Sequence, residues 1–293
     1  MSNALRASSK RSSSVGASAN SNPRSAVWSS VRIIASHPGR VTVLWVSVRL
    51  YSYNLRTRTK GSANAPPQIL LVLRRLVHNG AMANNQEDLV RAIAAQGVRD
   101  PRLLRALRAV PRAVFVPPGL AEAAYLDQPL PIPHDQVTTQ PSLSAKMIEA
   151  LGLEGPERIL EIGTGYGFQT ALLCRLSGFV RSVERFADVA ETARANLARH
   201  GAANVEVVVG DGTGGLPEHA PYGAILVSAA FPSVPPPLVE QLAPGGRLVQ
   251  PIGPGGREEV VLFEKGPQGL ERRRTVTGAH FVRLYGTHAF PEG

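Results

Sequence analysis

Three glycines and one acidic residue stand together in the segment EIGTGYGF, where a short apolar run gives way to a helical pattern. Gly163, Gly165 and Gly167 alternate with single residues, so the backbone can approach a ligand closely and the N–H groups at the helix start can point toward it. A dinucleotide fingerprint would require glycine at position 168, which is phenylalanine. Glu161, in the strand before the turn, would repel an anion and tolerate an ammonium group. The turn therefore indicates a ligand that need not be a pyrophosphate, although an ordinary tight turn remains the alternative.

Two further acidic residues follow the next two predicted strands. Glu184 ends the run VRSVE, about 20 residues past the glycines, where a carboxylate can accept hydrogen bonds from both ribose hydroxyls. Asp211 follows VEVVV and can accept from the amino group of an adenine, with the Gly212 N–H beside it. Taken singly, Glu184 can be a solvated strand end and the GDG segment a plain turn. Together with the glycine turn, these residues predict a pocket for adenosine that carries a cationic side arm.

The elements that must position these residues alternate in type after residue 157. Short runs rich in Val, Ile and Leu predict strands at 158–162, 179–184, 205–209, 223–227 and 246–251, and helical patterns fall between them at 167–177, 187–200 and 234–242. This alternation predicts an α/β fold with a doubly wound, mostly parallel sheet. Two further strand-like stretches, EEVVLFEK and LERRRTVTGAHFVRLYG, have no helix between them and are expected to pair antiparallel at one edge.

A helical subregion is expected before the sheet. Asn84 or Asn85 can cap a first helix, Asp100 with Pro101 starts a second, and a third spans about residues 141–151. Between the second and third helices, VPRAVFVPPG is expected to be extended, and YLDQPLPIPHDQVTTQPS is too interrupted for regular structure. The predicted organisation is an N-terminal extension at 1–81, helices and a substrate loop at 82–157, and a ligand-binding core at 158–293.

The positive charge of the chain is confined to its first part. Twelve of the 32 Lys and Arg side chains and none of the 22 Asp and Glu side chains lie in residues 1–81, so the remainder carries 20 basic and 22 acidic side chains. The predicted globular part is therefore close to neutral and shows no electrostatic footprint for nucleic acid.

The extension itself leaves three interpretations open. Its first residues are rich in Ser, Ala and Arg and are expected to be disordered. The later apolar stretch is interrupted by Arg32, His37, Arg40 and Arg49 well short of the ~20 residues of a membrane span, so no transmembrane helix is predicted. The extension is interpreted as an over-extended start or functionless leader, as a targeting segment, or as an interaction tail.

The remaining reactive side chains do not form a second site. Cys174 is the single cysteine, which excludes an intramolecular disulfide and fits a reducing compartment such as the cytoplasm. It lies within a predicted helix and is expected to be structural rather than nucleophilic. His134, His200 and His219 are scattered without metal-ligand spacing, so no metal is expected.

Motifs spread along the chain resemble those of one enzyme family. They are VPRAVFVP, AYLDQPLPI, QVTTQPSLSAKM, LEIGTGYGFQTALL, VERFADVAETARANL, the long block that begins GDGTGGLPEHAPYGAILVSAAF, and FVRLYG. The glycine turn is similar to that of class I S-adenosylmethionine-dependent methyltransferases in general. QVTTQP and the GDG block resemble the protein-L-isoaspartate O-methyltransferase family in particular, over about residues 84–286.

The resemblance implies a seven-stranded Rossmann-like fold, S-adenosylmethionine as cofactor, and methyl transfer to the free α-carboxyl of L-isoaspartyl residues. Such methylation initiates repair of damaged proteins. The implied partners are isoaspartyl-containing proteins and peptides, and the implied form is a cytoplasmic monomer that needs no metal and binds neither membrane nor nucleic acid.

The resemblance also assigns residues. The family's loop has the form Q-T-x-S-Q-P, and its active-site serine aligns with Thr139, which keeps the hydroxyl and adds a methyl group. Val137 stands where the family has threonine, and Tyr285 where many members have threonine. Substrate contacts are implied at the following residues: Thr138, Gln140, Ala229, Ala230 and Pro232.

Two alternatives to this function remain open. A methyltransferase of the same fold can act on another protein carboxylate or on a small molecule, which the departures at Thr139 and Tyr285 would favour. The second alternative is a non-enzymatic cofactor-binding module that is tethered to RNA through the basic extension.

Overall fold

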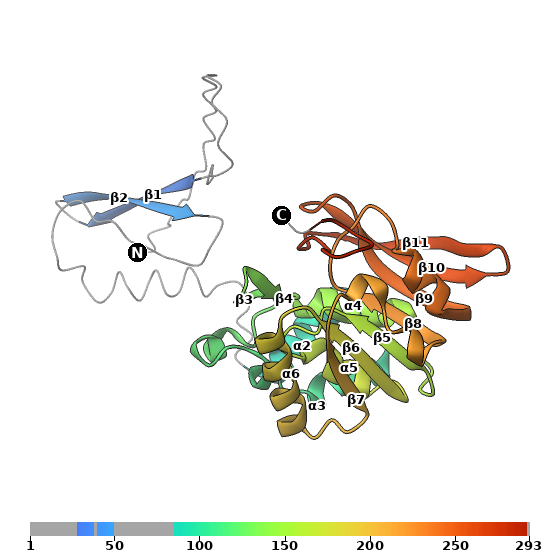
Figure 1. Cartoon of the computed structure of the whole chain (residues 1–293). Helices are drawn as coiled ribbons and strands as arrows, with labels where there is room; N and C mark the ends of the chain where they lie inside the picture. Colours follow the sequence, from blue (N-terminus) through green and yellow to red (C-terminus); the bar gives the residue numbers. More distant parts are fainter. Residues whose placement is uncertain (1–27, 38–39, 50–84, 292–293) are drawn as a thin grey trace, which may run out of the picture. The chain divides into compact units, whose positions relative to one another are not determined.

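The computed structural model describes residues 28–37, 40–49 and 85–291 (Figure 1). The chain divides into two units, residues 1–77 and 78–293. In the first unit, β1 (Trp28–His37) and β2 (Arg40–Arg49) pair antiparallel. These strands lie within the extension whose start was predicted to be disordered; residues 1–27 themselves lie outside the described residues. Across the described ranges, no helix has both the length and the apolar character that crossing a membrane requires.

The second unit is built on a seven-stranded sheet with the order β11-β10-β9-β8-β5-β6-β7 (Figure 1). The strands β5 to β9 run parallel to one another, and β10 and β11 add to β9 as antiparallel strands at one edge. The strands are β5 (Arg158–Ile162), β6 (Phe179–Glu184), β7 (Val205–Val209), β8 (Tyr222–Val227), β9 (Leu242–Ile252), β10 (Glu258–Gly266) and β11 (Gly269–Ala279). The predicted doubly wound fold with an antiparallel edge is confirmed.

Helices cover both faces because the central strands are apolar on both. Along β5, Ile159 belongs to one buried cluster together with α4 and α5, whereas Leu160 and Ile162 belong to a second cluster on the opposite face. Strands buried on both faces are typical of parallel sheets. The helices between the strands are α5 (Phe168–Cys174), α6 (Ala187–His200) and α7 (Pro236–Gln241).

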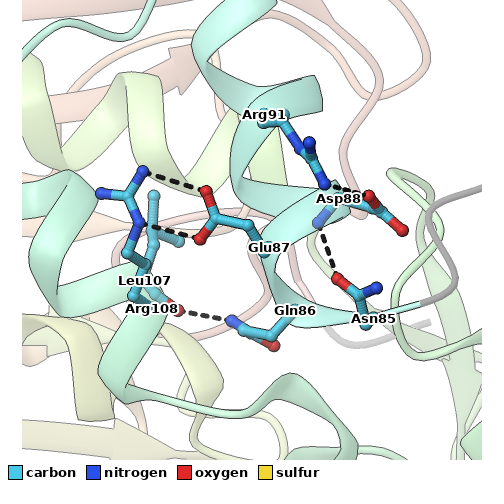
Figure 2. Close-up of polar contacts among 7 residues, drawn as sticks. All are labelled: Asn85, Gln86, Glu87, Asp88, Arg91, Leu107 and Arg108. Carbon is cyan, nitrogen blue, oxygen red and sulfur yellow. Dashed lines mark hydrogen bonds and ion pairs between the residues drawn. The ribbon is translucent and has the colours of Figure 1, made fainter.

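Three helices precede the sheet: α2 (Gln86–Ala95), α3 (Pro101–Ala109) and α4 (Pro141–Leu151). Figure 2 shows that Asn85 caps α2 by accepting a hydrogen bond from the Asp88 N–H at 3.0 Å. Glu87 pairs with Arg108 of α3 at 2.9 Å, and the Gln86 amide donates to the Leu107 carbonyl (Figure 2). The predicted helices are therefore correct, and of the two predicted caps Asn85 is the one used.

The passage between α3 and α4 corrects the prediction of irregular structure. It contains two 3₁₀ turns, η1 (Arg112–Phe115) and η2 (Pro118–Ala123), and a hairpin of β3 (Leu130–Ile132) and β4 (Gln136–Thr138). His134 and Asp135 form the hairpin turn with positive φ angles of 61° and 55°. Strands of three residues are too short to show a periodic pattern, so the sequence alone did not indicate them.

Several boundaries also differ from the prediction. The helix after the glycine turn ends at Cys174 rather than residue 177, and β9 begins at Leu242 rather than residue 246. The last predicted strand segment ends as an irregular chain after β11, in which Arg283 makes an isolated bridge with Ala230.

Candidate active site

A cavity of about 480 Å³ opens where β5, β6 and β7 end and where the β3–β4 hairpin meets α4. Nine of the thirteen residues that the sequence assigns to the site line it: Thr138, Thr139, Gly163, Gly165, Gly167, Glu184, Asp211, Gly212 and Ala229. Four do not: Gln140, Glu161, Ala230 and Pro232. The structure thus brings the predicted glycine turn, two of the predicted carboxylates and the predicted active-site hydroxyl to one cavity.

The glycine turn has the backbone conformation that requires glycine. Gly163, Gly165 and Gly167 all have positive φ angles, of 92°, 55° and 93°. A Cβ on Gly167 would lie 3.2 Å from the Leu197 side chain of α6, so this glycine also allows α5 and α6 to pack closely. The turn leaves backbone rather than side chains at the cavity wall.

Glu184 ends β6 and faces the cavity while it holds the surrounding loops. Its carboxylate accepts hydrogen bonds from the backbone N–H groups of Gly165 at 2.8 Å, Arg185 at 2.9 Å and Phe186 at 3.2 Å. Burial raises the pKa of Glu184 above its ordinary value, and these backbone hydrogen bonds oppose the rise. Two carboxylate oxygens offer about four acceptor positions, so at least one remains for a ligand hydroxyl.

Glu161, which the sequence assigns to the cofactor site, does not line the cavity. It is fully buried and accepts hydrogen bonds from Gln169 at 3.0 Å, Thr170 at 2.5 Å and Ser182 at 2.6 Å. Burial raises its pKa to about 7, against these three hydrogen bonds, which lower it. Glu161 therefore ties α5 and β6 to β5 beneath the glycine turn.

Asp211 faces the cavity and also fastens the C-terminal segment. Oδ1 accepts from the Thr213 N–H at 2.9 Å and the Thr213 hydroxyl at 2.6 Å, and Oδ2 accepts from the Thr287 N–H at 2.7 Å. Burial favours a higher pKa, but the hydrogen bonds from Thr213 and Thr287 outweigh it and lower the pKa of Asp211 to about 2. A Cβ on Gly212 would lie 2.4 Å from Ile162, so only glycine fits beside the end of β5.

In the predicted substrate loop, Thr139 has an unpaired hydroxyl among the described residues, whereas the side chains of Thr138 and Gln140 are hydrogen-bonded within the protein. Thr139 is half-buried and lines the cavity, and its hydroxyl has no hydrogen-bond partner within residues 85–291. The Thr138 hydroxyl instead accepts from Arg112 and from the Leu130 N–H, both at 3.1 Å. Gln140 donates to Asp127 at 3.1 Å at the start of α4 and lies outside the cavity wall. Only Thr139 is placed to address a substrate with its hydroxyl.

Arg112 is a positioning residue that the sequence reasoning missed. Its guanidinium is fully buried and donates to the carbonyls of Ala124, Leu126 and Gln128 at 3.1, 2.7 and 2.8 Å, besides the Thr138 hydroxyl. Burial lowers the pKa of Arg112 to about 10, and the charge of Asp127 opposes this. An arginine between two apolar runs, in VPRAVFVP, was the available signal, because such a side chain is retained in a core only when it has several acceptors.

In the segment after β8, one predicted substrate residue lines the cavity and two do not. Ala229 lines the cavity, whereas Ala230 is fully buried and exchanges backbone hydrogen bonds of 2.8 Å with Val282 and Leu284. Pro232 is exposed and lies outside the cavity wall. The C-terminal chain that Ala230 anchors brings Tyr285 into the cavity lining.

The other reactive groups stay apart from the cavity. Burial raises the pKa of the Cys174 thiol to about 12, so this cysteine has little thiolate character. Within the described part of the chain, no three His, Cys, Asp or Glu side chains are grouped so that they could hold a metal ion.

The sheet, the glycine turn and the carboxylates at the ends of successive strands define the class of S-adenosylmethionine-dependent methyltransferases with a Rossmann-like fold. Within that class, residues 84–289 match the model of the family Protein-L-isoaspartate(D-aspartate) O-methyltransferase (PCMT). The chain belongs to this family.

Individual relatives agree with the family match. The chain is 48% identical over 202 residues to the protein-L-isoaspartate O-methyltransferase of Methanoculleus marisnigri, which covers 69% of this chain and 91% of the relative. It is 49% identical over 206 residues to that of Anaeromyxobacter dehalogenans strain 2CP-C, covering 70% of this chain and 98% of the relative.

Solved structures show the same fold. One protein-L-isoaspartate O-methyltransferase has a TM-score of 0.60 at 30% identity, with 70% of this chain and 67% of that chain covered. A putative member from Plasmodium falciparum, solved in complex with S-adenosyl-L-homocysteine, also has a TM-score of 0.60, at 22% identity, with 69% of this chain and 99% of that chain covered. The predicted family is confirmed.

Proposed function

We propose that this chain is a protein-L-isoaspartate O-methyltransferase that transfers the methyl group of S-adenosylmethionine to the free α-carboxylate of L-isoaspartyl residues. The observation that carries the proposal is a juxtaposition. Thr139, which aligns with the family's active-site serine, and the glycine turn at 163–167 line the same cavity. A cofactor seated on the turn and a carboxylate held by Thr139 would therefore meet.

The residues of the cavity fit S-adenosylmethionine. The bare backbone of the glycine turn permits close approach, Glu184 retains an acceptor position for a ribose hydroxyl, and Asp211 with Gly212 borders the expected place of the adenine. When bound, S-adenosylmethionine supplies a methyl group made electrophilic by its sulfonium. The complex of the Plasmodium falciparum protein with S-adenosyl-L-homocysteine supports the same class of ligand.

The chain's own contribution to the reaction is orientation rather than proton transfer. A carboxylate with a pKa near 4 is already ionised at neutral pH, so the attacking oxygen needs no general base. The Thr139 hydroxyl can donate one hydrogen bond to that carboxylate and hold one of its oxygens in line with the methyl group. Fixing two reactants in this way can lower a barrier by roughly 7–11 kcal/mol in favourable cases.

Arg112 supports this geometry without touching the substrate. It fixes the hydroxyl of Thr138, the residue next to Thr139, and three carbonyls of the preceding loop. The loop that presents Thr139 is therefore anchored to a fully buried charge. Such preorganisation limits the motion that the substrate must overcome on binding.

The proposal includes the form in which the enzyme works: a cytoplasmic monomer acting on damaged proteins, without metal, membrane or nucleic acid. The near-neutral charge after residue 81 supports the last point, and an ionised nucleophile needs no Lewis acid. Size-exclusion chromatography and activity in the presence of a chelator test the monomer and the metal-free reaction.

The decisive experiment offers radiolabelled S-adenosylmethionine with two peptides that differ only in Asp versus L-isoAsp at one position. Label confined to the isoAsp peptide, and lost as methanol in mild base, is expected. Label on both peptides would favour a carboxyl methyltransferase of other specificity. No transfer, with intact cofactor binding, would favour a binding module.

A further inference from the structure

One buried acceptor atom in the cavity wall, on the side chain of Gln169, makes no hydrogen bond to the described residues. Gln169 lies in the first turn of α5, the residue is 7% exposed, and it lines the cavity. Its Nε2 donates to Glu161 Oε1 at 3.0 Å and to Ser228 Oγ at 2.8 Å. Its Oε1 is buried and has no hydrogen-bond partner within the part of the chain that the structure describes.

The orientation of this amide follows from its neighbours. A carboxylate offers only acceptors, so the Gln169 NH₂ group must face Glu161 and the carbonyl must face away from it. The Thr170 and Ser182 hydroxyls also donate to the ionised Glu161, which is consistent with this orientation of the amide. Buried polar atoms are rarely left without a partner, so Oε1 points to a donor that the ligand supplies.

The position of Gln169 in the sheet indicates which part of the ligand this is. The central strand order is β8-β5-β6-β7, with Asp211 after β7, Glu184 at the end of β6, and Gln169 bridging the ends of β5 and β8 through Glu161 and Ser228. An adenine at Asp211 and a ribose at Glu184 direct the methionine part of the cofactor toward Gln169.

Charge selects one group within that methionine part. The Glu161 carboxylate lies directly behind the Gln169 amide, at 3.0 Å, and is shielded from water. In its ionised form, which a cation in the cavity favours, Glu161 disfavours the cofactor carboxylate and favours the cofactor ammonium group, which is also the only donor of the two.

We propose that Gln169 Oε1 accepts a hydrogen bond from the α-ammonium group of S-adenosylmethionine, with Glu161 providing the charge behind it. The assignment rests on the proposed function and adds to it a cofactor-binding residue outside the glycine turn and the two strand-end carboxylates. Glu161 thereby acts on the ligand through Gln169 rather than by contact.

The test measures binding rather than turnover. Isothermal titration calorimetry of the full chain compares S-adenosyl-L-homocysteine with its analogue in which hydrogen replaces the α-amino group. Wild-type protein is expected to bind the amino compound more tightly. Gln169→Met keeps the length of the side chain but removes the acceptor. It is expected to weaken binding of the amino compound by about 10- to 100-fold and binding of the analogue by less than about threefold.

Thr170→Val is the matched control. It removes another hydrogen bond to Glu161 from the same helix turn, but Thr170 does not line the cavity. It is expected to change the affinities of the two compounds by equal factors. Melting temperatures of both variants in the absence of ligand monitor folding.

Equal losses for the two compounds in Gln169→Met would overturn the assignment of Gln169 while leaving the proposed function standing. Absence of S-adenosyl-L-homocysteine binding in the wild-type protein would overturn both. A loss confined to the amino compound supports the assignment, since a general disturbance of the buried cluster would affect both compounds.

Discussion

The imidazole ring of His134 stacks on the phenyl ring of Phe186, with centroids 4.1 Å apart and planes inclined by 6°. His134 Nε2 also lies 2.9 Å from Asp188 Oδ1. His134 is at the tip of the hairpin that leads to Thr139, and Phe186 follows Glu184 in the loop before α6. The stack therefore joins the element that carries the proposed substrate hydroxyl to the loop that carries the proposed ribose acceptor.

This contact predicts a role in retaining the cofactor. His134→Ala removes the ring and is expected to weaken S-adenosyl-L-homocysteine binding by about 2- to 10-fold, mainly through faster dissociation. Stopped-flow fluorescence or surface plasmon resonance measures the dissociation rate. Asp188→Asn keeps the stack and should stay within about twofold of wild type, because the contact between His134 and Asp188 is exposed. Equal effects of the two changes would attribute retention of the cofactor to the contact with Asp188 rather than to the ring stack.

The sequence predicted the parts of the site that local chemistry determines. Gly163 and Gly167 need positive φ angles and close packing, and no other residue type meets these demands cheaply. Glu184 is the last residue of its strand, so its side chain reaches the edge where parallel strands end, whichever face it takes.

Strand geometry, which the sequence does not show, decides where Glu161 lies. Side chains alternate along β5, and Glu161 shares the face of Ile159, beneath α5, whereas Leu160 and Ile162 face the other layer. A residue one position before the strand end is therefore directed into the helix layer rather than to the ligand. The pairing of Thr138 with Arg112 was equally hidden, because it joins residues 26 positions apart through a fold of short turns.

Glu184→Gln tests the proposed ribose contact. The amide keeps one acceptor oxygen but replaces a charged acceptor by a neutral group, so S-adenosyl-L-homocysteine binding is expected to weaken by about 10- to 100-fold by calorimetry. Glu206→Gln, on the neighbouring strand, loses an exposed carboxylate that pairs with Arg181 at 3.1 Å and should bind normally. Unchanged affinity in Glu184→Gln would remove this residue from the cofactor site.

Glu161 predicts a pH dependence of stability. Its pKa rises from 4.5 in the unfolded chain to about 7 in the folded one, mainly through burial. Between these values the folded state holds a proton that the unfolded state has lost, so this contribution is fully present below pH 4.5 and disappears as the pH rises through 7. The free energy of unfolding of the wild type, relative to Glu161→Gln, should fall by on the order of 3 kcal/mol across this window.

Urea unfolding at closely spaced pH values between 5 and 8 measures this difference. Taking the difference between the two proteins cancels the titration of the other groups. Parallel curves for wild type and Glu161→Gln would contradict a raised pKa at this position.

Removal of the extension tests the proposed domain boundary. The family match begins at residue 84 and the first helix is capped by Asn85, so a chain that starts at Met82 retains every described contact of the catalytic unit. Its melting temperature and its activity on the isoAsp peptide should equal those of the full chain. A decrease of more than about 5 °C, which corresponds to roughly 1–2.5 kcal/mol in a domain of about 200 residues, would show that the extension stabilises the enzyme.

Thr139 provides the sharpest test of the reaction, because the neighbouring threonine serves as its control. Thr139→Val keeps the shape and removes the only hydroxyl proposed to hold the isoaspartyl carboxylate, so kcat/KM should fall by about 10- to 100-fold. Thr139→Ser should preserve or raise it. Affinity for S-adenosyl-L-homocysteine and the melting temperature should change little in both variants, since the Thr139 hydroxyl has no partner within residues 85–291.

Thr138→Val should behave in the opposite manner. It deprives the buried Arg112 guanidinium and the Leu130 N–H of their acceptor, so the melting temperature should fall along with activity. Together the variants would show that the Thr139 hydroxyl acts on the substrate and that the Thr138 hydroxyl stabilises the loop. Equal kcat/KM values for Thr139→Val and Thr139→Ser would contradict the proposed role, because these variants differ in the hydroxyl on which it depends.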